Sequence, residues 1–166
     1  MPIARSLIRL AAVLWLLLTC LNPTVQAQTP EKVITVEGVT QYRLDNGLQV
    51  LFLPDPSKGI ATVNLTVLAG SLHERYGETG MAHLLEHLVF KGSPKYPEPK
   101  MEMQRRGLSW NGTTSDDRTN YFASFSSSDE TMAWYLGWQA DALVNSNIAR
   151  QDLDSEMSVE IGRAHV

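Results

Sequence analysis

The stretch GMAHLLEHLVFKGSPKYP, residues 80–97, decides how the middle of this chain folds. Its apolar residues recur at the spacing of an amphipathic helix, and Gly92 followed by Pro94 ends that pattern. We therefore expect a helix that begins at Thr79, whose hydroxyl can cap the first turn, and ends at Lys91. Each residue of a helix turns by about 100°, so the two faces of this one can be assigned. The apolar face, expected in the core, carries Met81, Leu84, Leu85 and Leu88.

The opposite face of this helix carries His83, Glu86, His87 and Phe90. Histidines four residues apart on a helix project side by side, so both imidazoles can bind one metal ion. Glu86 lies between them, where it can accept a proton from a water whose pKa zinc lowers to about 7. The alternative is a pair of core or surface histidines that share this spacing by chance. The pattern favours a zinc site.

Around this helix, the 166 residues are 43% hydrophobic and 19% charged, which is typical of one globular domain with a core. The first residues are different: Arg5 and Arg9 precede a short apolar run, and VQA precedes Gln28. This pattern predicts a secretory signal peptide over residues 1–27, too short in its apolar part for an ordinary membrane span. The expected location is a bacterial periplasm, and the alternative is lipid anchoring through Cys20.

Cleavage of that signal would leave 12 basic and 18 acidic residues, a net charge of -6, and no membrane span. Without a basic patch, nucleic acid is not an expected partner. Cys20, the one cysteine, would leave with the signal, so His and carboxylate side chains would have to hold any zinc ion.

The rest of the chain predicts an α+β fold, an antiparallel-dominated sheet packed with helices. Residues 28–40 read as a flexible leader, and Asp45-Asn46-Gly47 is the turn of a hairpin over residues 42–55. Further strands are expected over residues 61–71 and, as a pair, 108–126; further helices over 97–107, 129–146 and from Asp152.

Several motifs together carry a resemblance to a known family. H-x-x-E-H at residues 83–87 is the inverted zinc motif, and residues 80–97 resemble the active-site helix of the insulinase/pitrilysin/mitochondrial-processing-peptidase family. AGSLHE and DLDSEMSV resemble the strand exit before that helix and the family's third-ligand helix. WNGTTSDDRTNYF resembles N-A-x-T-x-x-D-x-T-x-Y, although Gly112 stands where the family usually has alanine. The resemblance runs from Tyr42 to Val159.

This resemblance implies a zinc (Zn2+) metalloendopeptidase that acts on peptides or unfolded protein. His83 and His87 would be metal ligands and Glu86 the general base, while Glu156 would support the ligands without binding the metal. An extended substrate would pair with a strand edge made of Trp110, Asn111, Gly112 and Thr113. A second, homologous half-domain would complete the enzyme as a partner.

The end of the chain departs from the family. Residues 41–159 would then be a truncated N-terminal peptidase domain, incomplete at its C-terminus, because the implied third ligand, a glutamate, falls on Arg163. Residues 160–166 match the translation of a sequencing-library adapter and would be an artificial tail, so the fragment itself is expected to be inactive. Two alternatives stay open: a natural short protein that uses Glu160 as third ligand, and a non-catalytic, peptide-binding or structural homologue.

Other conspicuous residues have simpler interpretations. His73 is expected in a solvent-facing loop rather than as a third ligand. Asp116 and Asp117 are expected to fix a hairpin turn. Three aromatic residues are expected to pack in the core: Trp134, Tyr135 and Trp138.

Overall fold

A computed structural model of the chain describes residues 29–163, with side chains described through Ser158. The expected signal peptide and the alternative anchor Cys20 lie outside the described residues, as do residues 164–166 of the expected tail. The chain forms two compact units that divide after Asp55, and each is described by itself. No helix within residues 29–163 is both long and apolar enough to cross a membrane.

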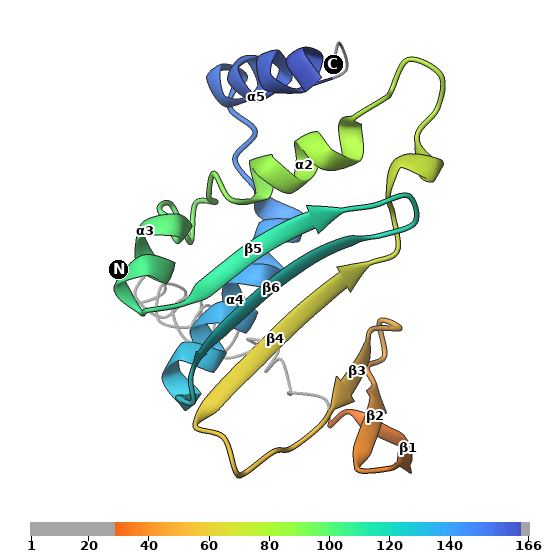
Figure 1. The fold of residues 1–166 in the computed structure, drawn as a ribbon, viewed down its shortest axis with the longest axis vertical. Coiled ribbons are helices and arrows are strands. Elements are labelled where there is room, and N and C mark those ends of the chain that lie inside the picture. Colours follow the sequence, from red (N-terminus) through yellow and green to blue (C-terminus); the bar gives the residue numbers. More distant parts are fainter. Residues whose placement is uncertain (1–28, 164–166) are drawn as a thin grey trace, which may run out of the picture. The chain divides into compact units, whose positions relative to one another are not determined.

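The first unit is a three-stranded antiparallel sheet, β1 (Glu31–Val36), β2 (Val39–Arg43) and β3 (Gln49–Phe52), in that order (Figure 1). The predicted hairpin is confirmed: β2 pairs with β3 across a turn in which Gly47 has a φ of 86°. The Asn46 side chain stabilises this turn because its Oδ1 accepts the Leu48 N–H at 3.0 Å.

The expectation of a flexible leader over residues 28–40 is wrong for the described part of that segment. Glu31–Val36 is strand β1, and it pairs with β2 through a tight turn at Glu37 and Gly38. Both turn residues have positive φ angles, 49° and 87°, which suits a two-residue hairpin connection. The sequence signal was weaker here because a Glu-Gly turn is less typical than Asn-Gly.

The second unit holds the sheet β4 (Ile60–Val67), β6 (Thr119–Ser126) and β5 (Ser109–Thr114), in the order β4-β6-β5 with both pairs antiparallel. The predicted strand pair over residues 108–126 is therefore confirmed. Alternate residues of β6 are buried, so one face of this sheet meets the core and the other does not. In the described part of the chain, β5 is an outer strand.

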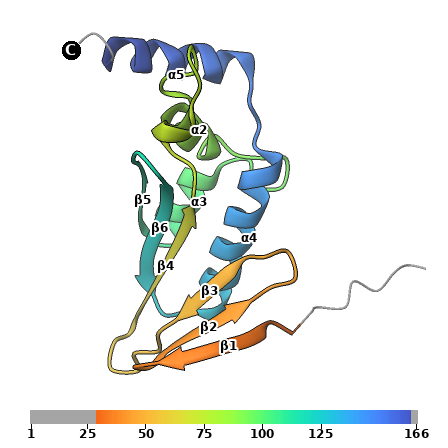
Figure 2. The same cartoon turned by 90° about the vertical axis from the view of Figure 1, so that its right-hand side faces the viewer.

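In the described part of this unit, one short 3-10 helix and two α-helices lie between β4 and β5, and two more α-helices follow β6. Their bounds are η1 Ser71–His73, α2 Met81–Val89, α3 Pro99–Arg105, α4 Asp129–Asn145 and α5 Arg150–Arg163. Helix α4 lies against the sheet (Figure 2), where the Phe125 and Tyr135 rings are 6.1 Å apart between centroids. Trp138 is fully buried beside them and Trp134 is partly buried, as the sequence predicted. Antiparallel sheets packed with helices confirm the predicted α+β class.

Two details of α2 correct the sequence analysis. The helix begins at Met81 rather than at Thr79, and Gly80 precedes it with a φ of 88°. Leu84 and Leu88 are buried as expected, whereas Met81 and Leu85 are 50% and 47% exposed. Phe90 lies in the core instead of on the histidine face. The helix therefore packs through a face rotated from the expected one.

Candidate metal centre

The two histidines of α2 point their Nε2 atoms at each other. These atoms are 3.2 Å apart, and the ring centroids of His83 and His87 are 4.6 Å apart. Two nitrogens bound to one zinc ion at about 2.0–2.1 Å, with a tetrahedral angle between them, lie roughly 3.3 Å apart. The spacing of the histidine pair therefore fits two ligands of one zinc ion.

Glu156 fixes the orientation of the second histidine. Its Oε2 is 2.8 Å from the Nδ1 of His87, and its Oε1 is 2.8 Å from the Lys91 Nζ. The hydrogen bond from Lys91, and then that from His87, lower the pKa of Glu156, so the carboxylate is the stable form. When Nδ1–H donates to this carboxylate, the Nε2 lone pair of His87 is left for a metal.

Glu86 is buried against strand β5, with only 7% of its surface exposed. The Thr114 hydroxyl donates a hydrogen bond to Glu86 Oε2 at 2.9 Å. A Cβ atom built on Gly112 would lie 2.6 Å from Glu86 Oε1 and 2.9 Å from its Cγ. The absence of a side chain at Gly112 thus makes room for the carboxylate.

The proposed substrate strand, residues 110–113, lies within β5, whose second edge has no strand partner among the described residues. The Trp110 side chain packs inward, 4.8 Å from Phe90 between ring centroids, so it serves the core. Asn111 and Thr113 are exposed, and Asn111 Oδ1 accepts the N–H of Gly112 at 3.0 Å. The strand is in place for pairing by its main chain, while its side chains are divided between two faces.

Glu74 organises the start of the histidine helix. Its carboxylate accepts the N–H of Gly80 at 2.9 Å and the N–H of Ala82 at 2.8 Å. First-turn N–H groups have no partner inside a helix, so this side chain replaces the cap expected from Thr79. The sequence did not predict this role, because Glu74 lies farther from the start of the helix than the residues that usually cap one.

Two further expectations concern the loop before α2 and the β5–β6 turn. His73 is exposed in η1, where its Nδ1 accepts the Gly70 N–H at 3.2 Å, as expected for a loop residue. Asp116 and Asp117 lie in the β5–β6 turn, as predicted. The Asp116 backbone oxygen accepts the N–H of Leu72 at 2.9 Å and so ties that turn to the loop.

A third metal ligand does not come from the described side chains. Among them, no group of three or more His, Cys, Asp or Glu residues is placed to hold a metal ion. Arg163, at the position implied for the third ligand, and the alternative Glu160 lie on α5 beyond the described side chains. The described side chains thus fit two zinc ligands and one supporting carboxylate.

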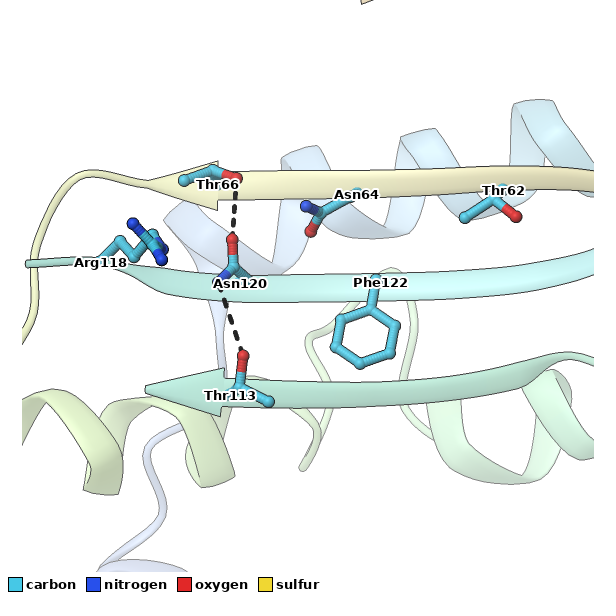
Figure 3. Close-up of a pocket in the computed structure, with 7 residues that line it drawn as sticks. All are labelled: Thr62, Asn64, Thr66, Thr113, Arg118, Asn120 and Phe122. Atoms are coloured by element: carbon cyan, nitrogen blue, oxygen red, sulfur yellow. Dashed lines mark hydrogen bonds between the residues drawn. The ribbon is translucent and has the colours of Figure 1, made fainter. Parts of the chain in front are cut away.

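A shallow hollow occupies the other face of the β4-β6-β5 sheet (Figure 3). Asn120 spans it, because its Oδ1 accepts from the Thr66 hydroxyl at 2.8 Å and its Nδ2 donates to the Thr113 hydroxyl at 3.5 Å. The face of β5 that carries Thr113 is opposite to the one that carries Gly112 and Thr114. The hollow is therefore separate from the Glu86 site. Its lining is Thr62, Asn64, Thr66, Thr113, Arg118, Asn120 and Phe122.

Comparison with known proteins places this chain in a family. The model of the insulinase family, peptidase family M16, matches residues 49–166. The chain belongs to peptidase family M16. The match covers the whole of the second unit, including His83, Glu86 and His87.

Relatives of this M16 chain include the β subunit of the mitochondrial-processing peptidase of Caenorhabditis elegans, 31% identical over 81% of the chain. Mouse insulin-degrading enzyme is 34% identical over 63% of it. The periplasmic protease PqqL from Escherichia coli is a structural neighbour, with a TM-score of 0.71, 26% identity and 81% of the chain covered. Pitrilysin has a TM-score of 0.65 and 27% identity over 80%.

The M16 chain spans only a part of these proteins. It covers 29% of the mitochondrial subunit, 11% of the insulin-degrading enzyme, 16% of PqqL and 14% of pitrilysin. The chain thus has the family and the fold of these proteins over the region that it shares with them.

Sequence reasoning missed Lys91, which contacts Glu156, and it missed the contact between Thr114 and Glu86. A signal for Lys91 was present: it follows His87 by four residues, as His87 follows His83, within the helix expected to end at Lys91. Thr114 matches the threonine of the N-A-x-T motif, but its pairing with Glu86 had no local signal, because Glu86 is 28 residues away in the sequence.

Proposed function

We propose that this M16 chain is the zinc-binding catalytic domain of a metalloendopeptidase. The observation that carries the proposal is the His83–His87 pair, whose Nε2 atoms are 3.2 Å apart while Glu156 accepts from the far side of His87. Two histidines oriented in this way, with a carboxylate behind one of them, are typical of a zinc site.

In this proposal His83 and His87 hold the zinc ion. The ion, when bound, supplies a Lewis acid that polarises the peptide carbonyl and lowers the pKa of water. Glu86 is the general base. Because the Thr114 hydroxyl occupies Oε2, Oε1 is the oxygen that accepts the proton of the attacking water and returns it to the leaving amine.

Strand β5 would bind the peptide. Its outer edge offers main-chain groups over residues 110–113, and pairing of main chains places few demands on the sequence of the substrate. The Gly112 N–H, held by Asn111 Oδ1 in this structure, is a donor that a substrate carbonyl would take over. The substrates we propose are therefore extended peptides or unfolded segments.

The third ligand and the second half-domain would come from a longer protein. Relatives of this chain are several times its length, which supports a larger assembly that encloses the substrate. The family resemblance implies a glutamate at position 163, where Arg163 stands, and Glu160 is the substitute within this sequence.

Metal analysis tests the proposal. The full-length protein should copurify with about one zinc ion per chain, and His83→Ala should remove it, because each ligand of a catalytic site is needed. A protein that binds peptides but takes up no zinc would be a non-catalytic homologue, the alternative function, and would overturn the proposal.

A further inference from the structure

Lys91 lies just beyond the C-terminal end of α2, four residues after His87. It follows Phe90, the residue that caps the C-terminal end of α2, and its Nζ lies 2.8 Å from Glu156 Oε1 and 3.7 Å from Asp152 Oδ1. Both acids belong to α5 and are four residues apart, so they face Lys91 from one side of that helix. One lysine at the C-terminal end of the histidine helix thus contacts α5.

The two oxygens of Glu156 have different partners. Oε2 faces the His87 Nδ1 and Oε1 faces Lys91, each at 2.8 Å. Only 16% of the Glu156 side chain and 27% of the Lys91 side chain are exposed, so water screens this contact less than it screens a surface ion pair. With one oxygen held by Lys91, the carboxylate cannot turn away from the imidazole without losing a charge-assisted hydrogen bond.

Over the described side chains of residues 150–158, helix α5 has few other means of attachment. None of its described side chains is fully buried, and Met157 is 41% exposed. Burial of apolar surface therefore contributes little to docking this helix, and the charged contacts with Lys91 and His87 contribute more.

We propose that Lys91 is a positioning residue of the candidate metal centre: it docks α5 on α2 and holds Glu156 in the orientation that fixes the His87 ring. The part of this inference that concerns the metal rests on the proposed function. The simpler interpretation is a cation that offsets the helix dipole at the C-terminal end of α2, which needs no partner on α5.

The first test measures docking without metal. In the full-length protein treated with a chelator, amide hydrogen exchange is followed for residues 150–158 in the parent and in Lys91→Met, Lys91→Arg and Lys95→Met. Loss of one charge-assisted hydrogen bond should speed exchange in Lys91→Met by about tenfold or more. Lys91→Arg, which can still reach the carboxylate, should stay near the parent. Lys95, an exposed lysine whose Nζ lies 5.3 Å from the Tyr96 ring centroid, is the matched control and should change nothing.

The second test measures positioning of the ligand. Lys91→Met should weaken zinc affinity by about 10-fold to 100-fold, the usual effect of removing a group that supports a metal ligand. Lys91→Arg should retain most of the zinc affinity of the parent. In Lys91→Met, the rate of peptide hydrolysis at saturating zinc should change far less than the zinc affinity does.

The two tests fail in different ways. Exchange and zinc affinity equal to the parent in Lys91→Met would leave Lys91 as a helix-end cation and overturn the inference. Faster exchange with unchanged affinity would overturn its metal part. A parent that binds no zinc would refute the proposed function instead, while the exchange measurement would still decide whether Lys91 docks α5.

Discussion

Glu86 shows how much a single residue depends on its neighbours from another element. The helix places it one residue before His87, but strand β5 decides where its carboxylate goes, through the Thr114 hydroxyl and the space above Gly112. Burial of a carboxylate is costly unless hydrogen bonds compensate for the lost water. The seat on β5 therefore both orients Glu86 and makes its burial tolerable.

The role of Glu86 as the base gives a direct prediction. In the full-length protein, Glu86→Gln should keep its zinc, because Glu86 is the proposed base and not a metal ligand. The variant should lose about 10²–10⁴-fold in the rate of peptide hydrolysis. Zinc content and kcat on one peptide substrate are measured together. Hydrolysis at the parental rate would show that another group is the base.

Thr114 gives a second residue-scale prediction. Thr114→Val keeps the shape of the side chain but leaves Glu86 Oε2 without its donor, so kcat should fall while zinc content stays constant. Thr114→Ser retains the hydroxyl and is the control, expected near the parent. Equal activity in the valine and serine variants would mean that the hydroxyl does not orient the base.

At the scale of elements, helix α2 is held at both ends by residues outside it. Glu74 binds the N–H groups at its start, and at the other end the Gly92 carbonyl accepts the Asn147 N–H of the segment after α4 at 2.8 Å. Buried Ser93 donates to Asp141 of α4 and accepts the Tyr96 N–H at 3.1 Å. These contacts fix the angle at which the histidines are presented.

Removing the cap tests its contribution. Glu74→Ala should lower the unfolding free energy by about 0.5–2 kcal/mol, as loss of a helix cap does, and Thr79→Ala is a nearby control. Denaturant unfolding measures both variants. Thr79→Ala should have little effect, since the structure gives the capping role to Glu74.

The Ser93–Asp141 contact predicts a response to acid. Hydrogen bonds from Ser93, and then from Asn145, lower the pKa of Asp141 below its ordinary value of 3.8. A carboxyl group with a lowered folded pKa adds stability that is complete above its ordinary value and is lost as the pH falls through the folded one. Ser93→Ala should therefore reduce stability at neutral pH and flatten its loss at acid pH, as measured by unfolding between pH 7 and pH 2. An acid unfolding curve parallel to that of the parent would contradict this.

The sequence predicted the elements well wherever the signal was local. The Asn46-Gly47 turn, the Pro99 start of α3 and the aromatic spacing of α4 all gave the correct element. Contacts between distant residues could not be read in this way. Glu74 is distant from the turn it caps, and the burial of Phe90 depends on Trp110 and Trp138, which lie in other elements. A helical pattern in the sequence indicates an apolar face, but the neighbouring elements determine how the helix is rotated about its axis.

At the scale of the whole molecule, the chain spans only a part of the length of its M16 relatives. Zinc ligands, base and substrate strand are proposed within this part, whereas relatives such as PqqL extend far beyond the region it matches. The N-terminal pattern predicts that the protein is exported. Among the similar structures, PqqL is a periplasmic protease.

Export can be checked by mass. If the signal is cleaved after Ala27, the exported protein should begin at Gln28, because small residues at the cut site suit signal cleavage. Mass spectrometry of the N-terminal peptide measures this. An intact Met1 would argue against export by cleavage, and a lipid-modified Cys20 at the terminus would favour the anchored alternative.

The outer edge of β5, proposed to bind substrate, also carries a risk of self-association. Among the described strands this edge has no partner. An edge that accepts any extended peptide also accepts the same edge of another molecule, so it is a starting point for aggregation. Gly112, a poor strand former, and Asn111, whose side chain occupies a main-chain donor, both make such self-pairing less favourable. The residues that keep this edge open to substrate would then also protect the protein from its own copies during storage at high concentration.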